Sequence, residues 1–204
     1  MTLYRCRPER NRQNGYTGVV ATLDLPRPDV PRPIAVVRDF VNTTDHETGA
    51  DDLTTPADLT RYLVAEGLME RASRASAADL ELALRLRAGL RRALELNHDG
   101  AADSLPALGE AMAELPVALA WTGDGAGLRP TEAGVRGALA AIGLAAHDAT
   151  ADGVWWRLKI CASDECEWAY YDHSKNRSRN WCEYGCGNKL KTRAYRARQA
   201  GRSA

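Results

Sequence analysis

The stretch "CASDECEWAYYDHSKNRSRNWCEYGC", residues 161–186, holds four of the five cysteines of this 204-residue chain. Four residues separate the first two cysteines, fifteen the middle two, and three the last two. Two close pairs joined by a spacer of that length are typical of a zinc site with four cysteine ligands. Each pair turns two thiolates toward one point, and a hairpin in the spacer completes the tetrahedron. The predicted cofactor is one Zn²⁺, bound by Cys161, Cys166, Cys182 and Cys186.

The residues around these cysteines agree with a metal site. Aromatic side chains stand at both ends of the spacer and can keep the metal dry, because so small a unit has little other core. Four thiolates leave no open position, so the metal is expected to be structural rather than catalytic. Two alternatives are that the cysteines stay reduced and buried, or that they form disulfides. His173 is an alternative ligand, although it lies in the turn expected over residues 172–180.

The last cysteine opens the basic stretch "CGNKLKTRAYRARQA", residues 186–200. A helix starting there would place Lys189, Arg193 and Arg196 on one face and small apolar residues on the opposite face, which is expected to pack. Long cations on a helix suit phosphates, and arginines in the spacer can bind phosphate or offset the negative charge of the thiolates. The predicted DNA contacts are Arg177, Arg179, Lys189, Lys191, Arg193, Arg196 and Arg198.

The formal net charge is zero, but the charge is divided unevenly along the chain. Residues 1–154 contain 16 Lys and Arg against 22 Asp and Glu, whereas residues 155–204 contain 11 against 5. A basic segment behind an acidic body indicates an anionic partner, with nucleic acid first, although a solvated terminus would look the same. Because one small finger buries little surface, specific DNA binding is expected to need a homodimer.

The rest of the chain predicts a helix-rich unit. Residues 34–45, "IAVVRDFVNTTD", are rich in β-branched side chains and predict a strand, or a strand leading into a helix. Thr55 and Ser76, each with an aspartate three residues later, predict the starts of two helices. A Gly/Asp turn within residues 117–131 predicts a hairpin, after which Thr131 is expected to cap a third helix.

Two further patterns complete the expected fold. Residues 153–161 return to strand character and lead into the first cysteine. The arginines of the second helix mostly lie outside its apolar stripe and are expected to form a solvated face: Arg85, Arg87, Arg91 and Arg92. The predicted fold class is α+β, a mostly helical N-terminal domain with a few short strands. A small treble-clef-like zinc finger follows, a β-hairpin and then a basic helix.

The first 33 residues hold six arginines and five of the nine prolines, which predicts a flexible leader over residues 1–33. No apolar run approaches the ~18–20 residues of a membrane helix, and no apolar segment suggests a secretory signal. A cytoplasmic protein without a membrane partner is expected. In that compartment clustered cysteines more often bind metal than form disulfides.

The stretch "CASDECEWAYYDHSKNRSRNWCEYGCGNK" resembles the CGNR zinc-finger proteins of bacteria. In that family an N-terminal domain called ABATE precedes the finger, and "RDFVNTTD" looks like its opening. Lys189 stands where the family has arginine, which keeps the charge but not the planar fork. The family positions matched in the finger, besides the cysteines, are Trp168, Asp172, Ser174, Asn176, Arg179, Trp181, Gly187 and Asn188.

The resemblance implies a zinc-containing, DNA-binding transcription regulator related to stress. It places an ABATE-like domain at residues 34–152, for ligand sensing or dimerisation, and the finger with its basic helix at residues 153–200. Asp39, Asn42 and Thr43 are candidates for binding a small-molecule effector, although a chain reversal that holds the fold explains them as well. The alternative function is a protein-interaction module that docks on acidic protein partners without direct DNA readout.

Catalysis is not expected. Asp45, His46 and Glu47 could form an acid–base or metal cluster, but no second histidine lies at ligand spacing. No phosphate loop, nucleophile elbow or zincin motif occurs in the sequence.

Overall fold

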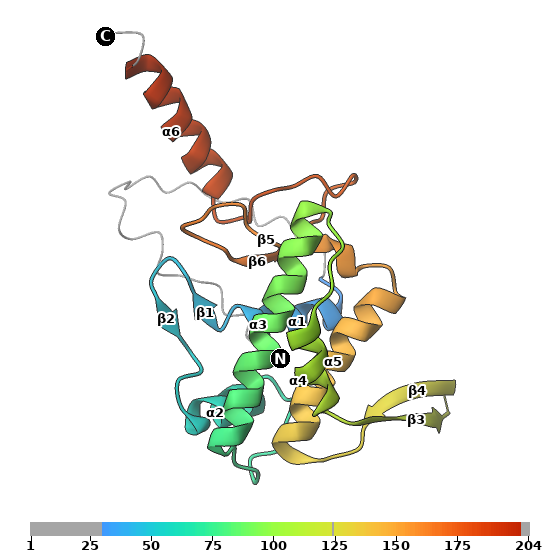
Figure 1. Cartoon of the computed structure of the whole chain (residues 1–204). Coiled ribbons are helices and arrows are strands. Elements are labelled where there is room, and N and C mark those ends of the chain that lie inside the picture. Colours follow the sequence, from blue (N-terminus) through green and yellow to red (C-terminus); the bar gives the residue numbers. More distant parts are fainter. Residues whose placement is uncertain (1–29, 124, 201–204) are drawn as a thin grey trace, which may run out of the picture.

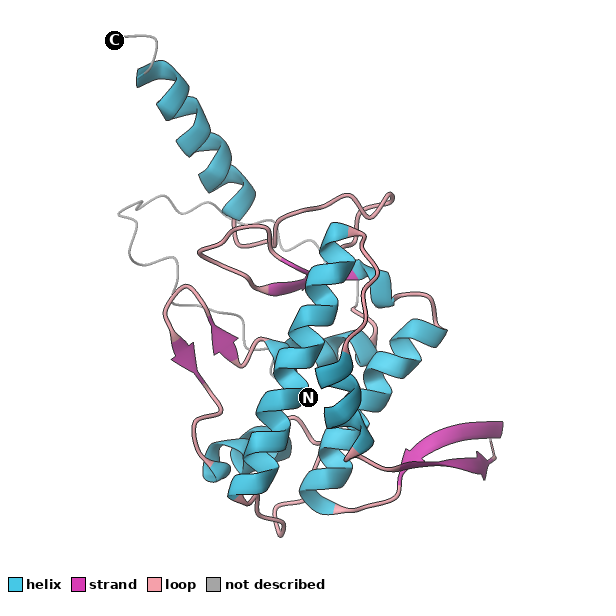
Figure 2. Ribbon diagram, viewed as in Figure 1, coloured by secondary structure: helices cyan, strands magenta, loops and turns pink. Residues whose placement is uncertain are grey.

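The computed structural model describes residues 30–123 and 125–200, so nearly all of the expected leader lies outside the described residues. The helices are α1 (Arg32–Val41), α2 (Pro56–Ala65), α3 (Ala77–Asp99), α4 (Pro106–Ala113), α5 (Gly134–Ala151) and α6 (Cys186–Ala200), with a 3-10 turn at Trp155–Arg157. Three antiparallel strand pairs connect them: β1 (Thr44–Asp45) with β2 (Ala50–Asp51), β3 (Val117–Thr122) with β4 (Gly125–Pro130), and β5 (Leu158–Ile160) with β6 (Ala169–Tyr171). The chain is therefore a mixed α+β fold with mostly helical secondary structure, as predicted (Figures 1 and 2).

The main core lies where α1, α3 and α5 pack together, with α2 and α4 added at the side. Phe40 of α1, Leu90 of α3 and Ile142 of α5 are fully buried in it. Gly89 lets α4 approach α3 closely, since a Cβ at this position would lie 2.8 Å from the Cβ of Leu108. Burial of these apolar stripes, rather than helix propensity, holds the bundle together.

The helix starts at Thr55 and Ser76 are confirmed. Each side chain accepts a hydrogen bond from the backbone N–H three residues on, and the carboxylate of Asp58 or Asp79 accepts one in return. Both are capping boxes. The first glycine after α3, Gly100, ends that helix with a positive φ of 66°.

The strand expected over residues 34–45 is wrong, because most of this segment forms helix α1. Pro33 lies in the first turn, where its fixed φ fits a helix and its missing N–H costs nothing. Ile34, Val37 and Val41 then recur at spacings of three and four, and all are fully buried. Helical spacing of the apolar residues outweighs their β-branching here.

The hairpin over residues 117–131 is confirmed as β3 and β4. Thr131 does not cap the following helix, because its hydroxyl instead donates to the carbonyl of Pro116 at 3.2 Å and closes the base of the hairpin. Helix α5 begins three residues later, after Ala133, without a side-chain cap. Residues 153–161 are a strand only from Leu158 onward.

The arginines of α3 divide into two kinds, so the expected solvated face is only half right. Arg85 and Arg92 are exposed and make surface ion pairs. Arg87 is only 11% exposed, and its guanidinium donates two hydrogen bonds of 2.8 and 2.7 Å to the carboxylate of Asp51. Arg91 is 13% exposed and points toward the cysteine-rich segment. Within the described residues, no helix is long and apolar enough to cross a membrane.

Candidate metal centre

The four predicted cysteine ligands meet at one buried point. Their sulfur atoms all lie within 4.8 Å of one another, and Cys182 Sγ lies 3.7 Å from both Cys166 Sγ and Cys186 Sγ. A tetrahedron with Zn–S bonds of about 2.3 Å has edges of about 3.8 Å, which matches these separations. The cysteines are positioned to bind one metal ion, and they fit one structural Zn²⁺.

Three local structures position Cys161, Cys166 and Cys186. Strand β5 leads into Cys161, whose N–H donates to the carbonyl of Trp168 at 2.9 Å. A tight turn then presents Cys166, with its N–H bonded to the carbonyl of Ser163 at 2.8 Å. The following Glu167 has a φ of 43°, in the left-handed region that a non-glycine residue rarely adopts. Cys186 stands at the first position of α6, so the helix begins at a metal ligand.

The thiols need a cation to release all their protons. Burial, together with repulsion from the negative charge on the neighbouring Cys166 sulfur, raises the pKa of the Cys186 thiol to about 11. Hydrogen bonding with Cys161 and Cys166 raises the pKa of Cys182 far above its usual range. The thiols of Cys161 and Cys182 donate to Cys166, which lowers the pKa of that thiol to about 2. Without metal, Cys182 and Cys186 therefore keep their protons at neutral pH, and a divalent cation would displace them.

Asp172 organises the loop between the two cysteine pairs. Its side chain is completely buried and lies 3.1 Å from the ammonium of Lys159, which is 6% exposed. It also accepts the backbone N–H groups of Ser174 and Arg179 at 2.9 and 3.0 Å. Burial alone would raise the pKa of Asp172, but the hydrogen bonds from Ser174, Arg179 and Lys159 outweigh it and lower the pKa. This network gives Asp172 and Ser174 a structural role in the finger.

Aromatic residues cover the metal site, as predicted. Trp168 and Tyr184 meet edge to face with ring centroids 6.1 Å apart and pack against the cysteine cluster. Trp181 packs over Gly187, where an added Cβ would lie 3.2 Å from the indole ring. The glycine of the CGN sequence thus allows the first turn of α6 to lie against this tryptophan. His173 instead packs edge to face on the ring of Tyr171, at 4.7 Å between centroids.

The predicted DNA contacts occupy different environments. Arg179 is half-buried: its Nε donates to the Trp181 carbonyl at 2.7 Å, and its guanidinium lies 5.8 Å from the Tyr170 ring centroid. Arg177 is exposed, with a φ of 53°. Lys189 pairs with Glu47 at 3.6 Å, and Arg193 with Glu165 at 2.8 Å. Lys191, Arg196 and Arg198 are exposed and make no ion pair with any residue that the structure describes.

Helix α6 projects outward from the rest of the molecule (Figure 1). The apolar strip expected to pack does not do so, since Leu190 is only half-buried and Ala197 is exposed. From Lys191 to Gln199, every side chain whose burial is described is exposed. The body supports the start of this helix through the metal site, whereas the described side chains of the following turns are exposed.

Asn42, one of the weak effector candidates, joins the helical body to the metal-binding segment. Its side-chain amide donates to the carbonyl of Ala169 at 2.9 Å and accepts the N–H of the same residue at 2.8 Å. Thr43 donates to the carbonyl of Phe40 and accepts a hydrogen bond from Arg87. Asp39 pairs with Arg38. The contacts of Asn42 and Thr43 favour the chain-reversal interpretation, and an effector role for the three residues stays a prediction.

Two further residues hold the same junction, and sequence reasoning missed both. Arg91 donates to the carbonyls of Glu167 and Val41 at 2.8 and 3.3 Å. His46 Nδ1 lies 3.0 Å from the carboxylate of Glu167. The sequence treats Arg91 as one of several surface arginines and His46 as a weak catalytic candidate. The only sequence signal for Arg91 is its position next to the apolar stripe of α3. No sequence pattern indicates its contact with Glu167, 76 residues later in the chain.

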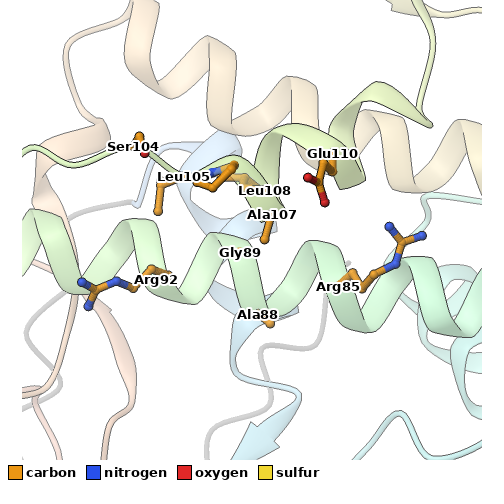
Figure 3. Close-up of a pocket in the computed structure, with 10 residues that line it drawn as sticks. Arg85, Ala88, Gly89, Arg92, Ser104, Leu105, Ala107, Leu108 and Glu110 are labelled. Carbon is orange, nitrogen blue, oxygen red and sulfur yellow. The ribbon is translucent and has the colours of Figure 1, made fainter.

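A shallow cavity lies away from the metal centre, between α3 and α4 (Figure 3). Its volume is about 360 Å³. Leu105, Leu108 and Gly89 line it, and Arg85 and Arg92 lie toward its two ends. No residue that the sequence nominated for a ligand lines this cavity.

The comparisons with known families agree with this arrangement. A family model described as "CGNR zinc finger" matches residues 157–199. A second model, ABATE, described as "Putative stress-induced transcription regulator", matches residues 35–153, more than half of the chain. The chain belongs to the ABATE family. The ABATE segment supplies the helical body, the CGNR finger supplies the metal centre, and neither match is to an enzyme family. A search of curated proteins found no match.

Proposed function

We propose that this ABATE protein is a DNA-binding transcription regulator that uses α6 as its reading element. The observation that carries the proposal is a cationic helix that starts at a metal ligand and projects from the body (Figure 2). Its described side chains from Lys191 to Gln199 are exposed. A 15-residue helix that packs only at its start is marginal in water over its outer turns, so a partner surface is expected to stabilise them. A duplex supplies that surface and the negative charge.

The cations of α6 fall on two faces. Lys189, Arg193 and Arg196 share one face at spacings of four and three. Lys191 and Arg198, with the exposed Tyr195 between them, share a second face. A helix lying in the major groove has a phosphate backbone on each side, so cations on two faces match it. Arg177 remains a candidate phosphate contact, whereas the contacts of Arg179 favour a role within the finger.

The alternative is that α6 docks on an acidic protein surface in the transcription machinery. The same charges would serve, and DNA would then bind weakly or not at all. Either role requires the protein to work in the cytoplasm, as the sequence predicts. The body would sense a small molecule or dimerise, and the cavity between α3 and α4 has the size that a small effector needs.

Fluorescence anisotropy of a labelled random duplex, measured over a salt series, distinguishes DNA binding from docking on an acidic protein. If five cations of α6 neutralise phosphates, a plot of log K against the logarithm of the salt concentration should have a slope of roughly −4.5. Lys191→Ala should reduce that slope by about 1, while Arg71→Ala, which removes an exposed cation from the body, should leave it unchanged. No binding at low salt would rule out direct DNA readout and favour the protein-docking alternative.

A further inference from the structure

The hairpin β3–β4 presents one continuous apolar face. Its strand register pairs Val117 with Pro130, Leu119 with Leu128, and Trp121 with Ala126. Side chains of directly paired residues lie on the same side of an antiparallel ribbon, and alternate residues of a strand share a side. These six residues, which we name the arm face, therefore lie together without a charge among them.

The arm face is open to solvent. Trp121 is 84% exposed and Leu119 is 76% exposed, with Val117 at 42% and Leu128 at 37%. The hairpin extends beyond the helices, attached at its base near α5 (Figures 1 and 2). Exposure of a tryptophan and two leucines on one flat surface needs an explanation, since a solvated hairpin would carry polar residues there.

The base of the hairpin is firmly held, so the projection is built into the fold. Thr131 bonds to the Pro116 carbonyl through both its N–H and its hydroxyl. Gly137 of α5 passes so close to the chain after β4 that a Cβ there would lie 2.2 Å from the carbonyl oxygen of Glu132. An isolated two-stranded hairpin is marginal in water, which favours a partner for the part beyond this base.

We propose that the arm face binds the arm face of a second copy of this chain, the two hairpins stacked tip to base about a two-fold axis. The side chains on this face decrease in size from tip to base in β3, from Trp121 through Leu119 to Val117. Tip-to-base stacking sets each Trp121 on the partner's smaller Val117 and sets the two copies of Leu119 against each other. Large side chains then meet small ones, as close packing requires.

The area is sufficient for such a pair. Because an aromatic side chain covers about 150–250 Å², the four exposed residues present on the order of 400 Å² of apolar surface. Two copies together remove on the order of 800 Å², and Ala126, Pro130 and the strand backbones bring the total near the ~1,000 Å² of a specific interface. The uncharged arm face brings no like charges together on stacking.

Sedimentation of the zinc-loaded full-length protein without DNA tests the proposal. Across about 1–100 µM, wild type should shift toward dimer as mass action requires. Leu119→Glu should raise the dimer dissociation constant at least about 100-fold, since the interface would bury two unpaired charges. Ala118→Glu is the matched control: it places the same charge on the opposite face, beside Arg129, and should leave the dimer intact.

A charge-swap mixture tests the packing itself. Leu119→Glu and Leu119→Lys should each be monomeric, with unchanged circular dichroism and zinc content because Leu119 lies outside the core. Mixing the two should restore dimer, because the two-fold places the new charges opposite each other. A monomeric wild type, a dimer insensitive to Leu119→Glu, or a mixture that stays monomeric would overturn the proposal. Because the samples contain no DNA, these measurements test the arm face separately from DNA binding by α6.

Discussion

Single polar side chains join the two parts of this molecule at the residue scale. The amide of Asn42 meets both backbone groups of Ala169, and Arg91 reaches the carbonyl of Glu167 beside a metal ligand. These three bonds reach backbone groups of the finger, and the carboxylate of Glu167 adds a side-chain contact to His46. The ABATE body therefore fixes the position of the metal centre in part through Asn42, Arg91 and His46.

The ion pair of Asp51 with Arg87 gives a pH-dependent prediction. Burial opposes ionisation of Asp51, but hydrogen bonds from Arg87 and Leu53 outweigh it and lower the pKa of the carboxyl. A carboxyl with a lowered pKa stabilises the fold above its unfolded pKa of about 3.9 and loses that contribution as pH falls through the folded value. Asp51→Asn should therefore reduce the free energy of unfolding by about 1–3 kcal/mol at pH 7.

Denaturant unfolding of wild type and Asp51→Asn at several pH values checks this prediction. The difference in the free energy of unfolding between the two proteins should be constant from pH 7 to about 5 and should shrink below about pH 4. A difference that is the same at pH 3 as at pH 7 would show that the carboxylate charge contributes nothing to the pairing.

At the scale of single elements, helix α6 differs from every other helix in the described part of the chain. The helices of the body each bury an apolar face. In α6, every described side chain from Lys191 to Gln199 is exposed. Its attachments are the metal ligand Cys186, the packing of Gly187 on Trp181, and two surface ion pairs of the kind that contribute little. The outer turns are therefore expected to serve binding rather than stability.

Truncation after Lys191 tests this division of roles. The shortened protein keeps all four cysteines and should retain one zinc and a melting temperature within about 1 °C of wild type. It should lose most DNA affinity, because the deletion removes three of the five cations of α6. A fall in melting temperature of about 4 °C or more would mean that the outer turns pack on the body.

At the scale of the whole molecule, the finger and the helical body share one hydrophobic core. Leu158, Ile160 and Ala169 of β5 and β6 lie in the main hydrophobic core, together with side chains of α1, α3 and α5. The cysteines form a second small cluster above this strand pair. Loss of metal should therefore release the loops around the cysteines and the orientation of α6, while the strand pair stays anchored to the helices.

The sequence shows those parts whose residues interact over short distances or follow a period. The cysteine spacing predicts the metal centre, the two capping boxes predict the starts of α2 and α3, and the Gly/Asp turn predicts the hairpin. The strand predicted for residues 34–41 is wrong, because the helical spacing of the buried side chains outweighs their β-branching. The contacts of Asn42 and Arg91 could not be predicted, because each joins residues more than 70 positions apart through backbone groups that no sequence pattern marks.

Zinc titration into the metal-free protein, followed by anisotropy of a labelled duplex, tests the central claim most directly. That claim is that one zinc ion, held by four cysteines, positions α6 on DNA. DNA binding should rise with added zinc and saturate at one ion per chain, and Cys182→Ser should neither retain zinc nor bind. Full DNA binding without metal, or a protein loaded with one zinc that does not bind DNA at low salt, would contradict it.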